Sequence, residues 1–159
     1  MRSFTSLGNF STFLGGLVLA QVVAEQKALE RAAVLVERAA LKKIGHYQVR
    51  AGPFQAWPQL AAETQADRVT QHYTANDPLL RSGALFASIS HEVDGMTAVV
   101  GSDDPVALWQ EVGTKTNIPE RSFLGGAAEE HKEEILEIVG GGVVVTLVGG
   151  NVPVELLRD

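Results

Sequence analysis

The four histidines are the side chains in this sequence best suited to bind a metal ion or act as a general base. They are His46, His72, His91 and His131, and no two have the i, i+4 spacing that places a metal-binding pair on one helix face. The chain has no cysteine, which excludes disulfide bonds, thiolate clusters and a cysteine nucleophile. We therefore predict no metal site and no cofactor.

Nucleophilic catalysis and phosphate binding have no signature in the sequence either. Ser88 and Ser102 lie in no G-x-S-x-G turn, and residues 103–105 (Asp-Asp-Pro) are better explained as a turn that caps a helix. Glu111 would suit a general acid, but nothing in the sequence positions a partner for it. Residues 113–116 (Gly-Thr-Lys-Thr) resemble the end of a Walker loop without its first glycine and spacing. The sequence predicts no enzyme.

The polar loop after residue 112 carries side chains suited to contact with another protein. Trp109 lies in the apolar run before this loop, and Pro119 restricts the preceding residue to extended conformations. In an extended segment Arg121 and Phe123 would point to the same side, placing a guanidinium beside an apolar anchor. Two interpretations remain open. The pair forms an assembly contact, or Phe123 joins the core and Arg121 pairs with a nearby glutamate.

The first quarter of the chain is predicted to form a long amphipathic helix. Apolar residues recur at steps of three and four along it, from a start at Ser11 or Thr12 to Ile44. Gly45 can end this helix in a left-handed conformation, and residues 15–16 (Gly-Gly) weaken or break its first turns.

Shorter elements follow, and they define the fold class. Helices are expected over residues 58–72 and 127–138, and strands over residues 88–93, 96–101 and 143–148. Residues 79–89 and 106–112 fit either a helix or a strand. Asp94-Gly95 predicts a two-residue hairpin turn, and residues 140–142 (Gly-Gly-Gly) should stop the last helix.

These elements predict a single α+β domain over residues 1–159. A long N-terminal helix and further helices would pack on a small, mostly antiparallel sheet of three to five strands. The N-terminal helical segment would span residues 1–45, and a C-terminal strand and tail would span residues 143–159.

Charge is distributed unevenly along the chain. The net charge is −6; residues 1–100 carry 9 basic and 8 acidic groups, whereas residues 101–159 carry 4 basic and 11 acidic groups. No basic patch marks a free nucleic-acid binder. The acidic end is explained by a solvated surface or by a basic protein partner.

Residues 3–24 carry no charge, which raises the alternatives of a signal peptide or a membrane-spanning helix. Polar residues interrupt this segment, and a membrane span needs about 20 predominantly apolar residues. We therefore expect a buried helix and no membrane.

Several short motifs follow one another between Trp57 and Ala128. They are W-x-x-L-x-x-x-T at residues 57–64, L-x-R-S-G-x-L-x-x-S-I at 79–89, V-G-S at 100–102, an aromatic residue before E-x-G-T at 109–114, and I-P-x-R-x-F-L at 118–124. In this order and spacing the chain resembles the tail-completion and head–tail joining proteins of lambdoid siphophages. It also resembles their relatives, the virion morphogenesis proteins of Mu-like phages.

The resemblance implies a non-enzymatic structural protein of the phage neck, found in the virion and, during assembly, in the host cytoplasm. Such a protein forms a homo-oligomeric ring, sixfold or twelvefold, between the portal or its adaptor and the tail terminator or tail tube. DNA passes through the lumen without specific binding. An acidic lumen would keep DNA from adhering, and we place the glutamates of residues 129–134 there as a hypothesis.

The resemblance also assigns structural roles to individual residues. Arg81 and Gly83 would set the turn into the sheet, and Gly113 would permit a tight turn after Glu111. The loop and its contact with a neighbouring copy would depend on the remaining motif residues, which are Trp109, Thr114, Pro119, Arg121 and Phe123.

Other functions remain open. Within the neck, a tail terminator that caps the tail tube is a close variant. A small ligand-binding or enzymatic α+β domain would need a pocket with perturbed carboxylates. A secreted or membrane-anchored protein would use the apolar N-terminus.

Overall fold

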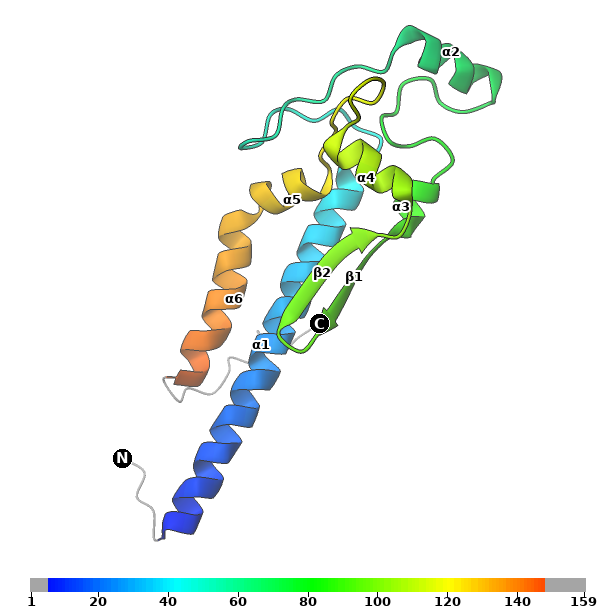
Figure 1. The fold of residues 1–159 in the computed structure, drawn as a ribbon. Coiled ribbons are helices and arrows are strands. Elements are labelled where there is room, and N and C mark those ends of the chain that lie inside the picture. The colour runs from blue at the N-terminus through cyan, green and yellow to red at the C-terminus, as the bar shows by residue number, and fades with distance from the viewer. Residues whose placement is uncertain (1–5, 148–159) are drawn as a thin grey trace.

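The structure is a computed structural model that describes the backbone of residues 6–147 and the side chains of residues 6–141. It has a long N-terminal helix, further helices and one antiparallel sheet, so the predicted α+β class is confirmed (Figure 1). In chain order the elements are α1 (Leu7–Lys43), α2 (Ala62–Thr70), α3 (Ala84–Ser88), β1 (Ile89–Asp94), β2 (Thr97–Ser102), α4 (Pro105–Val112), α5 (Leu124–Glu130) and α6 (Lys132–Leu147).

Helix α1 is longer than predicted and unbroken. It begins after Ser6, whose hydroxyl accepts a hydrogen bond from the Asn9 amide at 3.1 Å, so the cap lies five residues before the earliest predicted start. The two glycines at residues 15–16 are helical. At the other end Gly45 has the expected left-handed backbone, with φ of 89°.

Strands β1 and β2 form the hairpin predicted between them. Asp94 pairs with Thr97, so the two turn residues are Gly95 and Met96, one position later than predicted. Gly95 has φ of 56°, as this tight turn requires. The described residues contain only this two-stranded sheet, so the expected three to five strands are not found there.

The predicted strand at residues 143–148 is wrong for residues 143–147, because α6 continues through the three glycines to Leu147. Helix α6 lies along α1, and this packing outweighs the β propensity of the valines (Figure 1). The expected helix over residues 127–138 is divided at His131 into α5 and α6. The tail beyond residue 147 lies outside the described residues.

Helix α2 is shorter than predicted. Residues 58–61 precede it because the chain is still extended there: the Trp57 amide donates to the Gln48 carbonyl at 2.9 Å. His72 adopts a left-handed φ of 63° just after the helix. The two ambiguous segments resolve as helix followed by strand at residues 84–94, and as helix α4 at residues 105–112.

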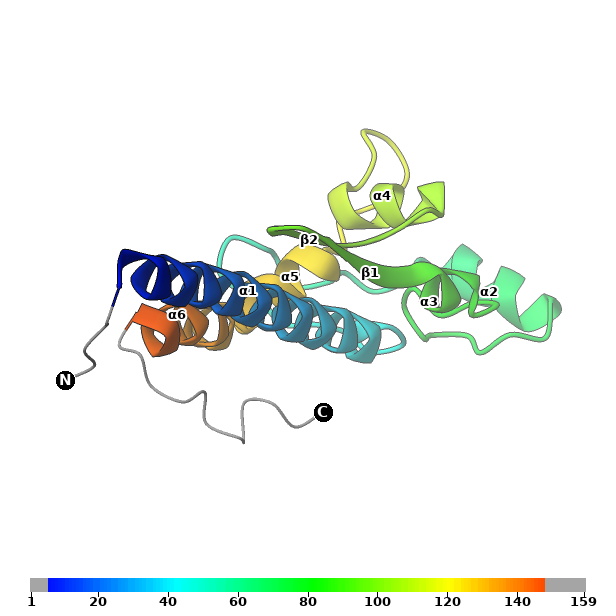
Figure 2. The same ribbon diagram turned by 90° about the horizontal axis from the view of Figure 1, so that it is seen from below.

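Helix α1 is the central element of the fold. The hairpin packs on one side of it and α5 and α6 pack on another (Figures 1 and 2). Small side chains of α1, such as Ala39 and Ala40, let its neighbours approach closely. They share one core with Trp57 and Phe123. The buried Lys43 is neutralised by Glu130 of α5, with 2.7 Å between Nζ and Oε1.

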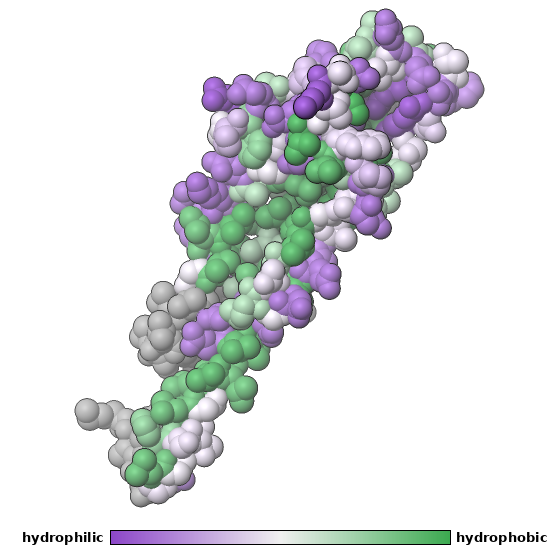
Figure 3. Space-filling view, viewed as in Figure 1, coloured by the Kyte–Doolittle hydropathy of each residue, from purple (hydrophilic) through white to green (hydrophobic). Residues whose placement is uncertain are grey.

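The N-terminal half of α1 extends past its neighbours as an apolar rod (Figures 1 and 3). Leu7 is 86% exposed and Leu19 is 70% exposed. By length and composition this helix could cross a membrane, a property shared by signal sequences and by core helices of soluble proteins. The expectation that this segment forms a buried helix is therefore wrong for its exposed residues.

Candidate assembly site

Glu111 joins the end of α4 to the start of α5. Its carboxylate accepts four hydrogen bonds: from the Ser122 hydroxyl at 2.5 Å and from the amides of Phe123, Leu124 and Gly125 at 2.8, 2.9 and 2.8 Å. Helix N-termini leave amide donors without partners and carry partial positive charge, so a carboxylate there is doubly favoured. Glu111 thus has a structural role in the fold and is placed as a cap, not as a general acid.

Gly113 makes the turn after Glu111, as the resemblance implied. Its φ is 70°, and a Cβ there would lie 2.8 Å from the backbone nitrogen of Glu120. The next residue, Thr114, closes the loop: its amide donates to the Ile118 carbonyl at 2.7 Å, and its hydroxyl accepts from the Ile118 amide at 2.9 Å. Position 113 therefore accepts only glycine without strain.

Arg121 and Phe123 do not form an exposed assembly contact, so that prediction is wrong. Phe123 is fully buried in the core, and Arg121 is 4% exposed. The alternative for Phe123 as a core residue is correct. Among the described residues Arg121 pairs with no glutamate: one of its terminal nitrogens donates to the Pro58 carbonyl at 3.0 Å. Pro119, in the loop just before, remains exposed.

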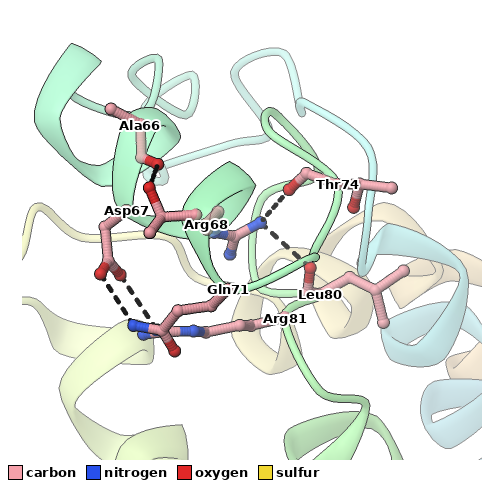
Figure 4. Close-up of polar contacts among 8 residues, drawn as sticks. Ala66, Asp67, Arg68, Gln71, Thr74, Leu80 and Arg81 are labelled. Atoms are coloured by element: carbon pink, nitrogen blue, oxygen red, sulfur yellow. Dashed lines mark hydrogen bonds and ion pairs between the residues drawn. The ribbon is translucent and has the colours of Figure 1, made fainter.

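Arg81 lies on the surface, where it holds the end of α2. Its guanidinium donates to Asp67 at 2.9 Å and to Gln71 at 2.7 Å, and it lies 5.5 Å from the centre of the Tyr73 ring (Figure 4). Gly83, with φ of 85°, starts α3, which leads directly into β1. Gly83 therefore sets the approach to the sheet, whereas Arg81 secures α2.

Arg68 on α2 is a buried cation that the sequence analysis did not single out. Its guanidinium donates to the Asp77 carbonyl at 2.7 Å. It also donates to the Leu80 carbonyl at 3.0 Å and makes a longer contact with the Thr74 carbonyl (Figure 4). Burial lowers the pKa of Arg68 from its ordinary value, and the nearby charge of Arg81 lowers it further. In the sequence, Arg68 follows Leu60, Ala61 and Thr64 at helical spacing, and this spacing could have indicated that its side chain lies on the buried face of the helix.

A cavity of about 530 Å³ lies between α2, α3, α4 and the loop that ends at Arg121. This volume falls within the usual range of ligand sites. Its lining residues include three arginines, Arg68, Arg81 and Arg121, together with Asp104. Aliphatic side chains supply most of the remaining wall.

Two of the lining residues each have a buried polar side-chain atom without a hydrogen-bond partner. These atoms are Nε of Arg121 and Oε1 of Gln110, a donor and an acceptor. The backbone amide of Arg121 donates to the Gln110 carbonyl at 2.7 Å, so the two residues are adjacent across the loop. Desolvation lowers the pKa of Arg121 from its ordinary value, and the charge of Arg68 adds to this effect.

Residues from the separate sequence motifs meet around this cavity. Its lining includes defining residues of three of the five motifs, namely Leu60, Thr64, Leu79, Arg81, Ser82, Gly83, Leu85, Ile118, Pro119 and Arg121, and also Gln110, a variable position of the fourth motif. The V-G-S motif contacts the motif of residues 79–89, because the hydroxyls of Ser88 and Ser102 lie 2.6 Å apart. Ser102 also accepts a hydrogen bond from the Asp104 amide at 3.0 Å. Segments distant in sequence therefore form one site.

Trp109 is a predicted site residue that remains available for contact with another molecule. It is 47% exposed, and Leu108 and Val112 of the same helix are more exposed still. Helix α4 begins at Asp104, whose carboxylate accepts from the Val106 amide at 2.9 Å. The predicted helix-capping turn at residues 103–105 is therefore confirmed, and α4 presents an apolar surface.

His91 links β1 to α1 through two carboxylates. Its Nε2 lies 2.9 Å from Oε1 of Glu30, and its Nδ1 makes a short contact with Glu37. Hydrogen bonds to Glu30 and then to Glu37 raise the pKa of His91 above 6.5. Sequence spacing could not reveal this cluster, because 54 residues separate His91 from the nearer of its two partners. No group of three or more potential metal ligands occurs among the described residues.

No protein-family model, no curated protein and no solved structure matches this chain. Its function is therefore inferred from the residues and their geometry.

Proposed function

We propose that this chain is a structural protein of the phage neck, which forms a ring that joins the head to the tail. The observation that carries the proposal is the meeting of the motif residues around one cavity and one loop. A set of motifs that reflects one common fold should bring its residues into contact. Here Ser88 contacts Ser102, and Glu111 accepts hydrogen bonds from the Ser122 hydroxyl and from the amides of the three residues that follow it.

The surface of the chain supports a ring of identical subunits. Such a ring uses heterologous contacts, in which one patch meets a different patch on the next copy. The chain has two separate exposed apolar surfaces, the first half of α1 and the outer face of α4 around Trp109. Contiguous exposed apolar surface of this kind marks interaction sites. In this proposal the chain performs no catalysis.

The decisive experiment locates the polypeptide in the particle. Intact virions are analysed by mass spectrometry, and gold-labelled antibodies against the chain are imaged by electron microscopy. The proposal predicts label at the head–tail junction, and a nonsense variant of the gene should give separated heads and tails. Virions that lack the polypeptide, or a turnover reaction traced to it, would refute the proposal. Label at the tube end of free tails would identify the tail-terminator variant.

The acidic-lumen hypothesis needs one refinement. Glu130 pairs with Lys43 and has a structural role, whereas Glu133 and Glu134 are exposed at the start of α6. The double variant Glu133→Gln and Glu134→Gln should therefore slow DNA release without preventing assembly. Normal release kinetics from particles that carry both substitutions would contradict the hypothesis.

A second candidate function is supported by the exposed apolar half of α1. A protein anchored to a membrane through this helix would bury the same side chains in lipid. Flotation of the expressed chain with lipid vesicles tests this candidate. The neck proposal predicts that the chain stays in the unbound fraction, and co-flotation that survives high salt would favour the anchor.

A further inference from the structure

We propose that the cavity between α2, α3 and α4 is a binding site for a carboxylate of another polypeptide: a glutamate or aspartate side chain on a short segment with apolar neighbours. The proposal does not depend on the neck function, because it follows from the charges and the wall of the cavity alone.

Basic residues outnumber acidic ones in the lining of the cavity. Arg68, Arg81 and Arg121 belong to the lining, whereas Asp104 is the single acidic residue in it, and only Arg81 of the three arginines has a carboxylate partner, Asp67. Asp104 already caps α4. Among the described residues no carboxylate lies within ion-pair distance of Arg68 or Arg121, and the hydrogen bonds of both go to backbone carbonyls. Buried charge without a counter-charge is unfavourable, and a bound carboxylate would offset it.

The unpartnered atoms of the wall indicate what else the ligand provides. Arg121 is more than nine-tenths buried, and its Nε is a donor without an acceptor. Gln110 Oε1 is an acceptor without a donor. A free carboxylate satisfies only the first of these atoms. A carboxylate carried by a peptide satisfies both, because the peptide also brings backbone N–H groups.

Phosphate and nucleic acid fit this cavity less well than a peptide does. The carboxylate of Asp104 repels a phosphate group, with its charge of about −1.5 to −2, more strongly than it repels the single charge of a carboxylate. Most of the exposed wall is apolar, with Leu60, Leu85 and Val106 among its side chains. The whole chain is acidic, with a net charge of −6, and acidity disfavours approach to a polyanion. An aliphatic stem that ends in a single negative charge matches such a wall.

Nuclear magnetic resonance of the arginine side chains tests the proposal on the full chain. The ¹⁵N-labelled protein is titrated with acetyl-Leu-Glu-Leu-amide up to about 10 mM, which detects weak binding. We expect a saturable shift of the Arg121 Nε–H signal. The matched peptide with glutamine should bind at least about tenfold more weakly, because it lacks the charge. Absence of a saturable shift, equal binding of both peptides, or tighter binding of inorganic phosphate would each overturn the proposal.

A variant that supplies the missing charge internally gives a second test. Gln110→Glu places a carboxylate in the wall at nearly constant volume. It should raise the melting temperature by about 2–4 °C and abolish the peptide-induced shift of Arg121. Gln55→Glu, on the exposed connector, is the control and should change neither. A Gln110→Glu protein that is less stable and still binds the peptide would contradict the proposal.

The carboxylate can come from a second copy of this chain or from another protein. Glu133 and Glu137 are exposed residues of helix α6, which lies away from α2 of its own chain (Figure 1). If a second copy is the source, the Arg121 signal should shift as protein concentration rises. The double variant Glu133→Gln and Glu137→Gln should remove that shift while leaving peptide binding intact.

Discussion

Replacement of Glu111 by glutamine is the sharpest test of how this fold is held together. The carboxylate accepts from one hydroxyl and three amides at 2.5–2.9 Å, all at the start of α5. Glutamine has the same shape but only one acceptor oxygen, and its NH₂ group is a donor. One side of the amide would therefore face Ser122 and the Gly125 amide as a donor, where the carboxylate accepted from both.

The size of the effect follows from these contacts. The Ser122 hydroxyl can turn to accept from the new NH₂ group, but the Gly125 amide is left without an acceptor, at about 1–3 kcal/mol. The amides of Phe123 and Leu124 would donate to a neutral amide oxygen in place of a charged carboxylate oxygen, which should cost roughly 1 kcal/mol of stability each. We expect Glu111→Gln to lower the free energy of unfolding by about 3 kcal/mol.

Urea unfolding followed by circular dichroism, at matched protein concentration, measures this difference. The control is Glu120→Gln in the same loop, where the side chain is exposed; its effect should stay within about 0.5 kcal/mol. If the two variants differ by less than about 1 kcal/mol, Glu111 is not the cap on which the α4–α5 junction depends, and the structural role assigned to it is wrong.

Further predictions concern pH, backbone strain and assembly. Because hydrogen bonds to Glu30 and then Glu37 raise the pKa of His91 above 6.5, its contribution to stability is complete below that pH and is lost as pH rises through the folded-state pKa. Melting temperatures between about pH 5 and pH 9 should show this loss, and His91→Gln should remove it. Gly113→Ala should destabilise by more than 1 kcal/mol, at about the level of other strained sites, whereas Gly101→Ala, with open space around it, should be nearly neutral in the same urea assay. If the chain forms rings, its melting temperature should rise with protein concentration, and an invariant value would argue against self-association.

Elements with strong local signals were predictable from the sequence. The repeat of apolar residues identified α1, Asp94-Gly95 identified the hairpin to within one residue, and Asp104 capped the helix that follows it. The valines after residue 142 led to a wrong strand prediction, because their β propensity contributes less free energy than the packing of α6 along α1. A tertiary contact of that kind has no signal in a local window.

The site was predictable only in part, for a related reason. The turn at Gly113 followed from its motif. The burial of Arg121 did not, because it depends on the connector around Trp57 and Pro58, more than 60 residues earlier in the chain. Extended geometry predicts only that two side chains can share a face. It cannot indicate whether that face meets solvent or the core.

The hydrophobic core of this chain contains few large side chains for the length of the chain. Among the described residues the largest fully buried side chains are Phe123 and Pro78, and much of the remaining core is alanine. Meanwhile leucines and valines of α1 and α4 lie exposed, and buried apolar area is the main favourable contribution to folding. Such a distribution favours a second surface that covers these side chains. In the neck proposal the next subunit of the ring supplies it, so folding stability and assembly would draw on the same residues.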